Sequence, residues 1–238
     1  MKFERWQAQG NVYLVAEEAL DAAAVRAEVG KTDGILEVTA RGEDWLDVTI
    51  WNPDGSQAQL SGNGTRIAAR WLAARSGAEV VTVRVGPREV VARMLGGSLV
   101  EQDMGAVVVQ QPEEVAGVRL TRVDVGNPHA VVEGNPAELP RIGPLLETHP
   151  RFPDRTNVQV ARRVADGEVE ARVWERGVGE TRSSGTSAVA VAAALGVSPA
   201  TIHFPGGELR VRIEDGRAHL TGPAERAETE AARRGGES

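Results

Sequence analysis

The sequence predicts a mixed α/β (α+β) fold built as two pseudo-symmetric lobes. Three observations carry the prediction: β-rich runs through most of the chain, two helices that each follow a Gly-rich turn, and motifs that recur about half a chain apart. Alternating apolar and polar residues indicate half-buried strands, whereas apolar residues three and four apart indicate a helix. A repeat on this scale predicts a duplicated architecture.

The first half of the chain shows strand patterns interrupted by one helix. That helix spans about residues 64–75 and carries Ile67, Ala68, Trp71 and Leu72 at helical spacing. The predicted strands are residues 1–6, 12–16, 35–39, 45–50, 80–85, 90–94 and 106–110.

The second half repeats this plan. A helix of small residues is predicted over residues 188–195, again directly after a Gly-rich turn. The predicted strands are residues 122–125, 130–132, 157–163, 168–174, 201–204, 208–214 and 217–221.

Paired motifs support the duplication. Residues 10–11 (GN) and 126–127 (GN) each follow a strand, and residues 61–64 (SGNG) and 184–187 (SGTS) each open a helix. We therefore expect two lobes with a substrate cleft between them. The predicted limits are 1–113 for the N-terminal lobe, 114–224 for the C-terminal lobe and 225–238 for a frayed, charged tail.

Composition restricts the function. The 238 residues carry a net charge of -7 and no basic stripe, which argues against a nucleic-acid partner. No apolar run is long enough to span a bilayer, and the charged amino terminus lacks a signal-peptide core, so a cytoplasmic location is expected. Cysteine is absent, and the four histidines are scattered, so a metal site is not expected. A pyridoxal-phosphate enzyme is not expected, because neither lysine, Lys2 or Lys31, lies in the Gly-rich setting of a Schiff-base lysine.

The two Gly-rich turns are candidate anion sites. The first N–H groups of a helix have no intrahelical acceptor, so a helix N-terminus can bind a carboxylate without a basic side chain. Taken alone, each turn is also compatible with an ordinary N-cap on a buried helix. Their occurrence at matching places in both halves favours a shared role.

Several polar residues flank these turns. Glu175 and Arg176 are adjacent and precede glycines, and together they could hold the ammonium and the second carboxylate of a zwitterion. A surface ion pair is the simpler interpretation of such a pair. Four asparagines lie at strand-to-turn junctions, where asparagine is also a common turn former: Asn11, Asn52, Asn127 and Asn157.

Over nearly its whole length the chain resembles the diaminopimelate epimerase family. The matching stretches are residues 6–11 (WQAQGN), 32–36 (TDGIL), 52–56 (NPDGS), 62–66 (GNGTR), 126–131 (GNPHAV), 152–158 (FPDRTNV), 175–181 (ERGVGET), 185–186 (GT) and 222–224 (GPA). Each stretch is weak evidence alone, but their order and spacing together are specific.

The resemblance implies a detailed fold and site. Each lobe is expected to be a curled β-sheet around a central helix, and members of the family often dimerise. The α-carboxylate of diaminopimelate, a lysine and cell-wall precursor, would lie at residues matching Gly62, Asn63, Gly185 and Thr186. The residue matching Glu175 would hold the α-ammonium. The distal end would be read by residues matching Asn52, Asn127, Asn157 and Arg176, with Asn11 lining the site. No metal, flavin, nicotinamide or pyridoxal cofactor is implied.

Serines stand at the family's two catalytic cysteine positions, as Ser61 and Ser184. In the family one thiolate removes the α-proton and the other thiol returns a proton on the opposite face. A thiol has a pKa of about 8.5, whereas the pKa of an aliphatic hydroxyl is far higher and close to that of water. The difference corresponds to ~10 kcal/mol at about 1.36 kcal/mol per unit, and a helix dipole supplies at most ~2 kcal/mol. Very low epimerase activity is therefore expected.

Three interpretations stay open at the level of sequence. The chain is an epimerase whose cysteines have been replaced by serine, to trap substrate or to remove oxidation. Alternatively it is a divergent isomerase or dehydratase of the same fold, related to the proline-racemase-like dehydratases and phenazine-biosynthesis isomerases, with a carboxylate or His129 as a single base. In the third interpretation it is a non-catalytic amino-acid-binding protein that retains the pocket.

Overall fold

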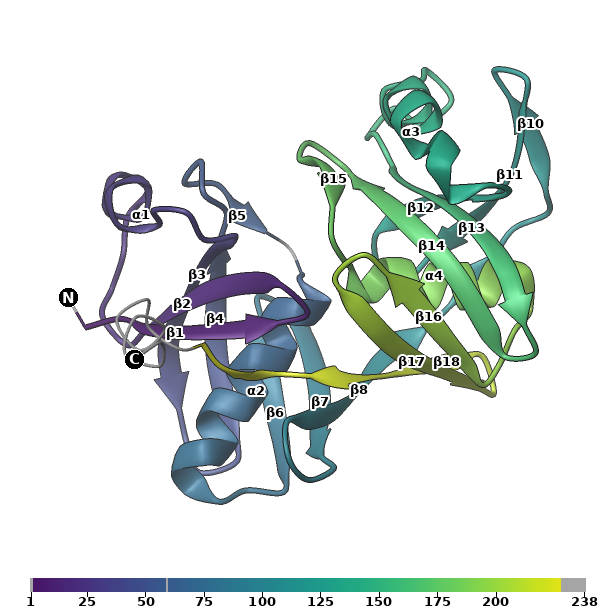
Figure 1. Ribbon diagram of the computed structural model, residues 1–238. Helices are drawn as coiled ribbons and strands as arrows, with labels where there is room; N and C mark the ends of the chain where they lie inside the picture. The colour runs from purple at the N-terminus through teal and green to yellow at the C-terminus, as the bar shows by residue number, and fades with distance from the viewer. Residues whose placement is uncertain (1, 59, 228–238) are drawn as a thin grey trace, which may run out of the picture. The chain divides into compact units, whose positions relative to one another are not determined.

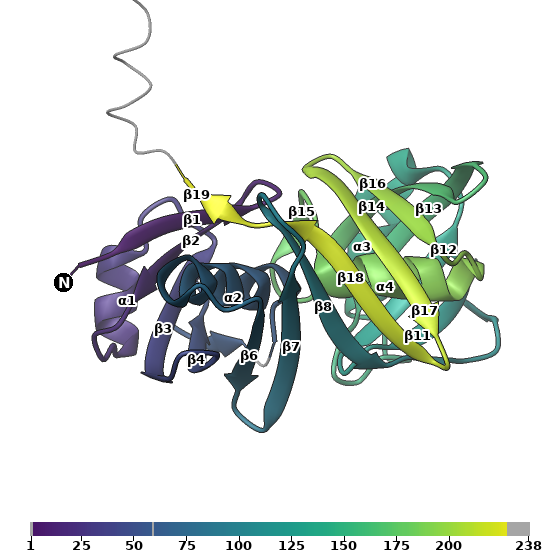
Figure 2. The same ribbon diagram turned by 90° about the horizontal axis from the view of Figure 1, so that it is seen from below.

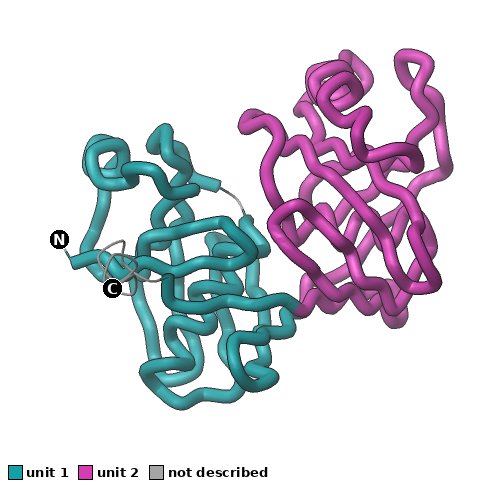
Figure 3. Tube along the Cα trace, in the orientation of Figure 1, with its two compact units in different colours: residues 1–102, 222–238 teal, residues 103–221 magenta. Residues whose placement is uncertain are grey.

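The computed structural model describes residues 2–58 and 60–227 and divides the chain into two compact units. Unit 1 comprises residues 1–102 and 222–238, and unit 2 comprises residues 103–221 (Figure 3). The sequence motifs placed the end of the N-terminal lobe at residue 113, and that limit stays a prediction. Of the predicted tail, Glu225 and Arg226 form a short strand, and residues 228–238 lie outside the described residues.

Unit 1 is a mixed sheet with two helices (Figure 1). Its strands are β1 (Glu4–Ala8), β2 (Asn11–Ala16), β3 (Gly34–Arg41), β4 (Trp45–Trp51), β5 (Gln57–Ala58), β6 (Val80–Val85), β7 (Arg88–Met94) and β19 (Glu225–Arg226). Its helices are α1 (Ala22–Glu28) and α2 (Gly62–Ser76). Strands β8 (Leu99–Ala106) and β18 (Arg217–Pro223) contain the points where the chain passes from one unit to the other.

Unit 2 has a comparable set of elements (Figure 2). Its strands are β9 (Val108–Val109), β10 (Glu113–Val115), β11 (Val118–Asp124), β12 (Pro128–Glu133), β13 (Asn157–Ala165), β14 (Glu168–Glu175), β15 (Gly179–Thr181), β16 (Ala200–Phe204) and β17 (Gly207–Glu214). Its helices are the 3-10 turn η1 (Pro136–Glu138), α3 (Leu139–Glu147) and α4 (Gly185–Leu195).

Strand pairing repeats between the units. In unit 1 and its connecting strand, neighbours pair in the order β1-β2-β3-β4-β6-β7-β8. The pairs β2–β3 and β4–β6 are parallel, and the other four pairs are antiparallel. The series β11-β12-β13-β14-β16-β17-β18 follows the same alternation. The predicted fold class, mixed α/β with two pseudo-symmetric halves, is thereby confirmed.

Each unit has its own core around one central helix. In unit 1, Ile67, Trp71 and Leu72 of α2 pack in one cluster with apolar side chains from β1 to β7. In unit 2, Val189 and Val191 of α4 pack with side chains from β11 to β18. Both helices end at a glycine in the left-handed conformation, a residue without the Cβ that would be strained there.

Some elements differ from the sequence-based expectation. The main strand expected over residues 106–110 lies earlier, as β8, and is followed by the short β9. The sequence patterns also missed α1 and α3; α3 contains Pro140, Gly143 and Pro144, residues that disfavour a helix in isolation. Within the described part of the chain, no helix has the length and apolarity needed to cross a bilayer.

Candidate functional site

The first candidate half-site lies at the N-terminus of α2. Ser61 is the N-cap residue, and its Oγ accepts a hydrogen bond from the Gly64 N–H at 3.0 Å. Its carbonyl oxygen accepts from the Thr65 N–H at 2.8 Å. The N–H groups of Gly62 and Asn63 occupy the first turn, where a helix supplies no backbone acceptor. This end of α2 therefore suits an anion.

Tyr13 contributes an unexpected contact to this half-site. Its hydroxyl lies 3.2 Å from the Ser61 Oγ, and the residue is only 7% exposed. Sequence reasoning did not select Tyr13 as a site residue. The available signal was its position on β2, two residues after Asn11, since residues i and i+2 of a strand share a face.

Two predicted amides meet beside the helix end. The Asn63 Nδ2 donates to the Asn11 Oδ1 at 3.1 Å, and the Asn63 Oδ1 accepts from the Arg66 Nη2 at 2.5 Å. Asn63 is 3% exposed and Arg66 is fully buried. The structure therefore joins two candidate site residues, Asn11 and Asn63, and adds Arg66, which lies in the 62–66 motif but was not selected as a site residue.

Asn52 belongs to a tight turn of its own. Its Nδ2 donates to the Ser56 Oγ at 2.9 Å, and its backbone N–H donates to the Ser56 carbonyl at 2.8 Å. The Asp54 carboxylate accepts from the Ser56 N–H and hydroxyl. The turn explains the Asn-Pro-Asp-Gly-Ser sequence, and no hydrogen bond described for Asn52 joins it to Ser61 or Asn63.

The second candidate half-site lies at the N-terminus of α4. Ser184 is the N-cap residue and is 7% exposed, and its carbonyl accepts from the Ala188 N–H at 3.0 Å. Unlike Ser61, its side chain makes no capping hydrogen bond. Gly185 and Thr186 follow at the first turn, so this helix end also suits an anion.

A buried polar chain supports this second helix end. The His129 Nε2 lies 2.9 Å from the Asn127 Oδ1, and the His129 Nδ1 lies 3.0 Å from the Gln159 Nε2. Since an amide nitrogen only donates, His129 carries its proton on Nε2 and donates to Asn127. The Asn127 Nδ2 in turn lies 3.4 Å from the Thr186 Oγ1. The structure thereby brings Asn127 close to Thr186, although the resemblance assigns these two residues to different ends of the substrate.

Burial controls the chemistry of His129. Desolvation lowers the pKa of this imidazole to about 3; the Gln159 hydrogen bond opposes the shift, and the Arg176 charge adds to it. The ring is therefore neutral at pH 7 and too weak a base to remove a proton from an α-carbon efficiently. This argues against the interpretation in which His129 acts as a single catalytic base.

Asn157 and Arg176 are joined through the backbone. The Asn157 Oδ1 accepts from the Arg176 N–H at 3.0 Å, and its Nδ2 donates to the Pro128 carbonyl at 3.0 Å. The Arg176 Nη1 donates to the Asp154 carbonyl at 3.1 Å. Asn157 therefore connects the strand that follows Asn127 with the turn that carries Arg176.

Glu175 lies at the end of β14, in the same turn. Its Oε1 accepts from the Thr181 hydroxyl at 2.5 Å, so one oxygen is oriented by a neighbouring side chain. Glu147 of α3 holds the turn from the other side, because its two oxygens accept from the Gly177 N–H and the Trp174 Nε1, each at 2.7 Å. Glu147 was not selected from the sequence, because it lies in a helix that the pattern did not predict.

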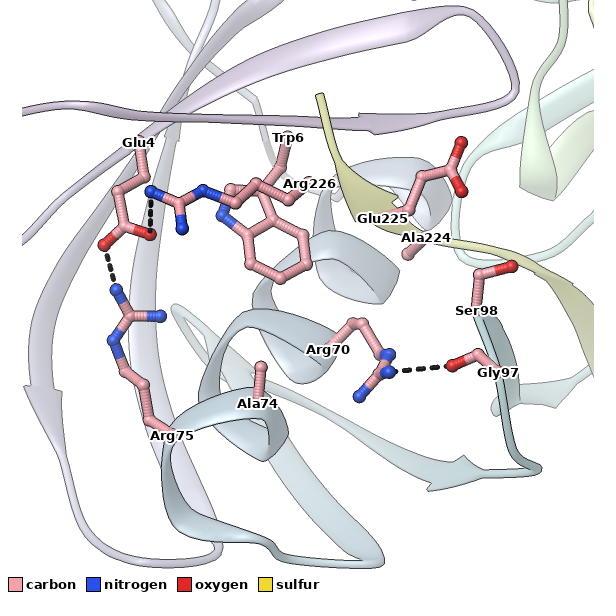
Figure 4. Close-up of a pocket in the computed structure, with 10 residues that line it drawn as sticks. All are labelled: Glu4, Trp6, Arg70, Ala74, Arg75, Gly97, Ser98, Ala224, Glu225 and Arg226. Atoms are coloured by element: carbon pink, nitrogen blue, oxygen red, sulfur yellow. Dashed lines mark hydrogen bonds and ion pairs between the residues drawn. The ribbon is translucent and has the colours of Figure 1, made fainter. Parts of the chain in front are cut away.

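The described residues contain no cluster of three or more His, Cys, Asp or Glu side chains suited to a metal ion. A separate surface pocket of unit 1 contains none of the predicted site residues (Figure 4). In it the Arg75 Nη2 donates to the Glu4 carboxylate and the Arg70 Nη2 donates to the Gly97 carbonyl. Because these charged groups pair with the protein itself, the pocket provides no evident ligand site.

Comparisons with known proteins find relatives that cover most of the chain. A family model described as diaminopimelate epimerase matches residues 121–227. A diaminopimelate epimerase of Synechococcus sp. (strain JA-2-3B'a(2-13)) is 37% identical, over 92% of this chain and 89% of that protein. A diaminopimelate epimerase of Thermobifida fusca (strain YX) is 38% identical, over 94% of this chain and 95% of that protein.

Solved structures share the fold at lower sequence identity. A structure described as a predicted epimerase from Pseudomonas aeruginosa has a TM-score of 0.71 at 17% identity, covering 95% of this chain and 96% of that chain. A probable proline racemase from Agrobacterium radiobacter K84 has a TM-score of 0.70 at 17% identity, covering 94% of this chain and 90% of that chain.

Proposed function

Because the chain belongs to the diaminopimelate epimerase family, an isomerase family of lysine biosynthesis, we propose that it binds diaminopimelate at the two half-sites. The observation that carries this proposal is the matched pair of helix N-termini. Each has a serine at the N-cap and an asparagine near its first turn, Asn63 on α2 and Asn127 beside α4.

Each part of the substrate has a chemically suitable partner. We assign the α-carboxylate to the backbone N–H groups of Gly62, Asn63, Gly185 and Thr186. Glu175 is assigned to the α-ammonium, because it is a carboxylate oriented by Thr181. The distal end is assigned to three amides and a guanidinium: Asn52, Asn127, Asn157 and Arg176. Asn11 lines the site beside Asn63.

The reaction of the family fold interconverts the LL and meso forms of diaminopimelate by two-base proton transfer. Here Ser61 and Ser184 occupy the positions of the two bases. The hydroxyl–thiol difference of ~10 kcal/mol in ease of ionisation greatly exceeds the ~2 kcal/mol that a helix end provides. We therefore propose substrate binding with very low epimerase activity.

A test combines binding with α-proton exchange. The protein, the Ser61→Cys/Ser184→Cys double variant and the Ser61→Ala/Ser184→Ala control are incubated with LL-diaminopimelate in deuterated water. NMR follows loss of the α-proton signal, and calorimetry measures binding. We expect all three proteins to bind the substrate. Only the cysteine variant should exchange the α-proton above the protein-free rate and form the meso isomer.

The outcomes separate the two parts of the proposal. If the cysteine variant neither binds diaminopimelate nor exchanges its proton, the assigned substrate or site is wrong. If the parent chain exchanges the proton well above the alanine control, a hydroxyl acts as a base and the low-activity part is wrong. Binding by the parent chain with no exchange even in the cysteine variant would favour a non-catalytic binding protein.

A further inference from the structure

Arg66 is a buried cation in the first two turns of α2. Its side chain is fully buried, and among the described residues no carboxylate forms an ion pair with it. Burial lowers the pKa of Arg66 to about 9, so the guanidinium is still charged at neutral pH. A buried charge without a counter-charge is destabilising, so its retention points to a task that a neutral side chain cannot perform.

The hydrogen bonds of Arg66 lead directly to the candidate site. Its Nη2 donates to the Asn63 Oδ1 at 2.5 Å, and its Nε donates to the Pro223 carbonyl at 3.1 Å. The Asn63 Nδ2 donates onward to the Asn11 Oδ1 at 3.1 Å. The Arg66 Nη1 is buried with no hydrogen-bond partner among the described residues.

Donor chemistry fixes the direction of this relay. A guanidinium only donates, so the Asn63 oxygen must face Arg66 and its amide nitrogen must face Asn11. The Asn11 oxygen then accepts, and the Asn11 nitrogen is turned away from Asn63. On the side away from Asn63, Asn11 therefore presents its amide N–H groups, which are donors, and a carboxylate requires donors.

We propose that Arg66 is a positioning residue that orients the carboxamides of Asn63 and Asn11, so that Asn11 presents N–H groups to a carboxylate of the bound amino acid. This inference rests on the proposed function and adds a residue to its site. Arg66 does not touch the substrate in this scheme. It acts through Asn63, and its positive charge is compensated when the carboxylate binds near the α2 N-terminus.

The test measures diaminopimelate affinity by calorimetry for Arg66→Gln, Arg66→Lys and the matched control Arg70→Gln. Arg70 lies on the same helix and donates to the Gly97 carbonyl away from the site. Loss of one charge-assisted hydrogen bond corresponds to about a tenfold weaker affinity for Arg66→Gln. Arg66→Lys, which keeps the charge and a donor, should recover part of the affinity, and Arg70→Gln should bind as the parent does.

A double-mutant cycle distinguishes positioning from a general effect on the fold. In an Asn63→Ala background the relay is already broken, so Arg66→Gln should cause no further loss of affinity beyond about twofold. An equal loss in both backgrounds would overturn the proposal, because Arg66 would then act by another route. Parental affinity in both Arg66→Gln and Arg66→Lys would also overturn it.

Side-chain amide NMR separates this inference from the proposed function. The relay exists without ligand, so the Asn63 and Asn11 amide resonances should shift in Arg66→Gln and Arg66→Lys but not in Arg70→Gln. If the parent chain fails to bind diaminopimelate while these resonances shift, the proposed function fails and the positioning role stands. Unchanged resonances in a folded Arg66→Lys variant would contradict the positioning role, even if Arg66→Gln does not fold.

Discussion

At the scale of single residues, the two serines of the candidate site occupy different surroundings. The Ser61 hydroxyl accepts a backbone hydrogen bond from Gly64 and lies beside the Tyr13 hydroxyl. The Ser184 hydroxyl does not cap its helix. Donors stabilise a negative charge at the atom that they contact. A thiolate placed at position 61 would therefore be stabilised by more hydrogen bonding than one at position 184.

His129 should make the stability of the protein depend on pH. Because burial lowers its pKa from 6.5 to about 3, the unfolded chain binds more protons than the folded chain between these values. The free energy of unfolding should therefore fall as the pH drops below 6.5, approaching about 1.4 kcal/mol per pH unit from this group. Urea denaturation between pH 4.5 and 6.5 measures the slope.

His129→Gln is the matched control for this effect, since glutamine is polar and does not titrate. Subtracting its profile removes the contribution of every other group. The parent should lose stability more steeply than the variant toward acid pH. Parallel profiles would show that His129 does not remain neutral in the folded protein.

Local motifs in the sequence select candidate site residues more readily than the residues that support them. The asparagines, the two N-cap serines and the Glu175-Arg176 pair all lie in recognisable motifs. Arg66 lies in one of these motifs too, but its full burial depends on the strands that surround α2. A charged residue on a helix is usually solvated, so the sequence does not predict that Arg66 is buried.

At the scale of secondary-structure elements, the two central helices begin in similar ways but should differ in capping energy. Ser61→Ala removes the hydrogen bond to the Gly64 N–H and should lower the free energy of unfolding by about 1 kcal/mol. Ser184→Ala removes no capping bond and should have a smaller effect. Urea denaturation of the two single variants compares them directly. An equal or larger loss for Ser184→Ala would contradict this difference.

The elements predicted correctly are those whose pattern is local. Both central helices follow a Gly-rich turn and contain small or helically spaced apolar residues, so α2 and α4 were expected. Helix α3 is specified by packing: a Cβ on Gly143 would lie 2.8 Å from Trp174 atoms, so only glycine fits that contact. Propensity alone argues against a helix at this position, and tertiary contacts override it.

At the scale of the whole molecule, the repeated strand order is what the sequence motifs implied. Two β-rich halves with matching turns predict two similar units, and the alternation of parallel and antiparallel pairs agrees between them. The return of residues 222–227 to unit 1 was not predictable, because it depends on pairing between Trp6 and Arg226, which are distant in the sequence. Local patterns do not report such long-range pairings.

The duplicated architecture raises the question of how many ligands one chain binds. Each unit has a helix N-terminus suited to a carboxylate, so two independent half-sites would bind two amino acids per chain. The proposed function instead assigns the ammonium to Glu175 of unit 2, and no comparable carboxylate is assigned in unit 1. We therefore expect calorimetry to give one diaminopimelate per chain.

Asn63→Ala in unit 1 and Glu175→Gln in unit 2 should each weaken that one binding event without changing its stoichiometry, because the same ligand depends on both. A stoichiometry of two ligands per chain would mean that the units bind separately. So would a substitution in one unit that leaves the affinity of a binding event at the parental value. Either result would rule out two-base epimerisation by this chain.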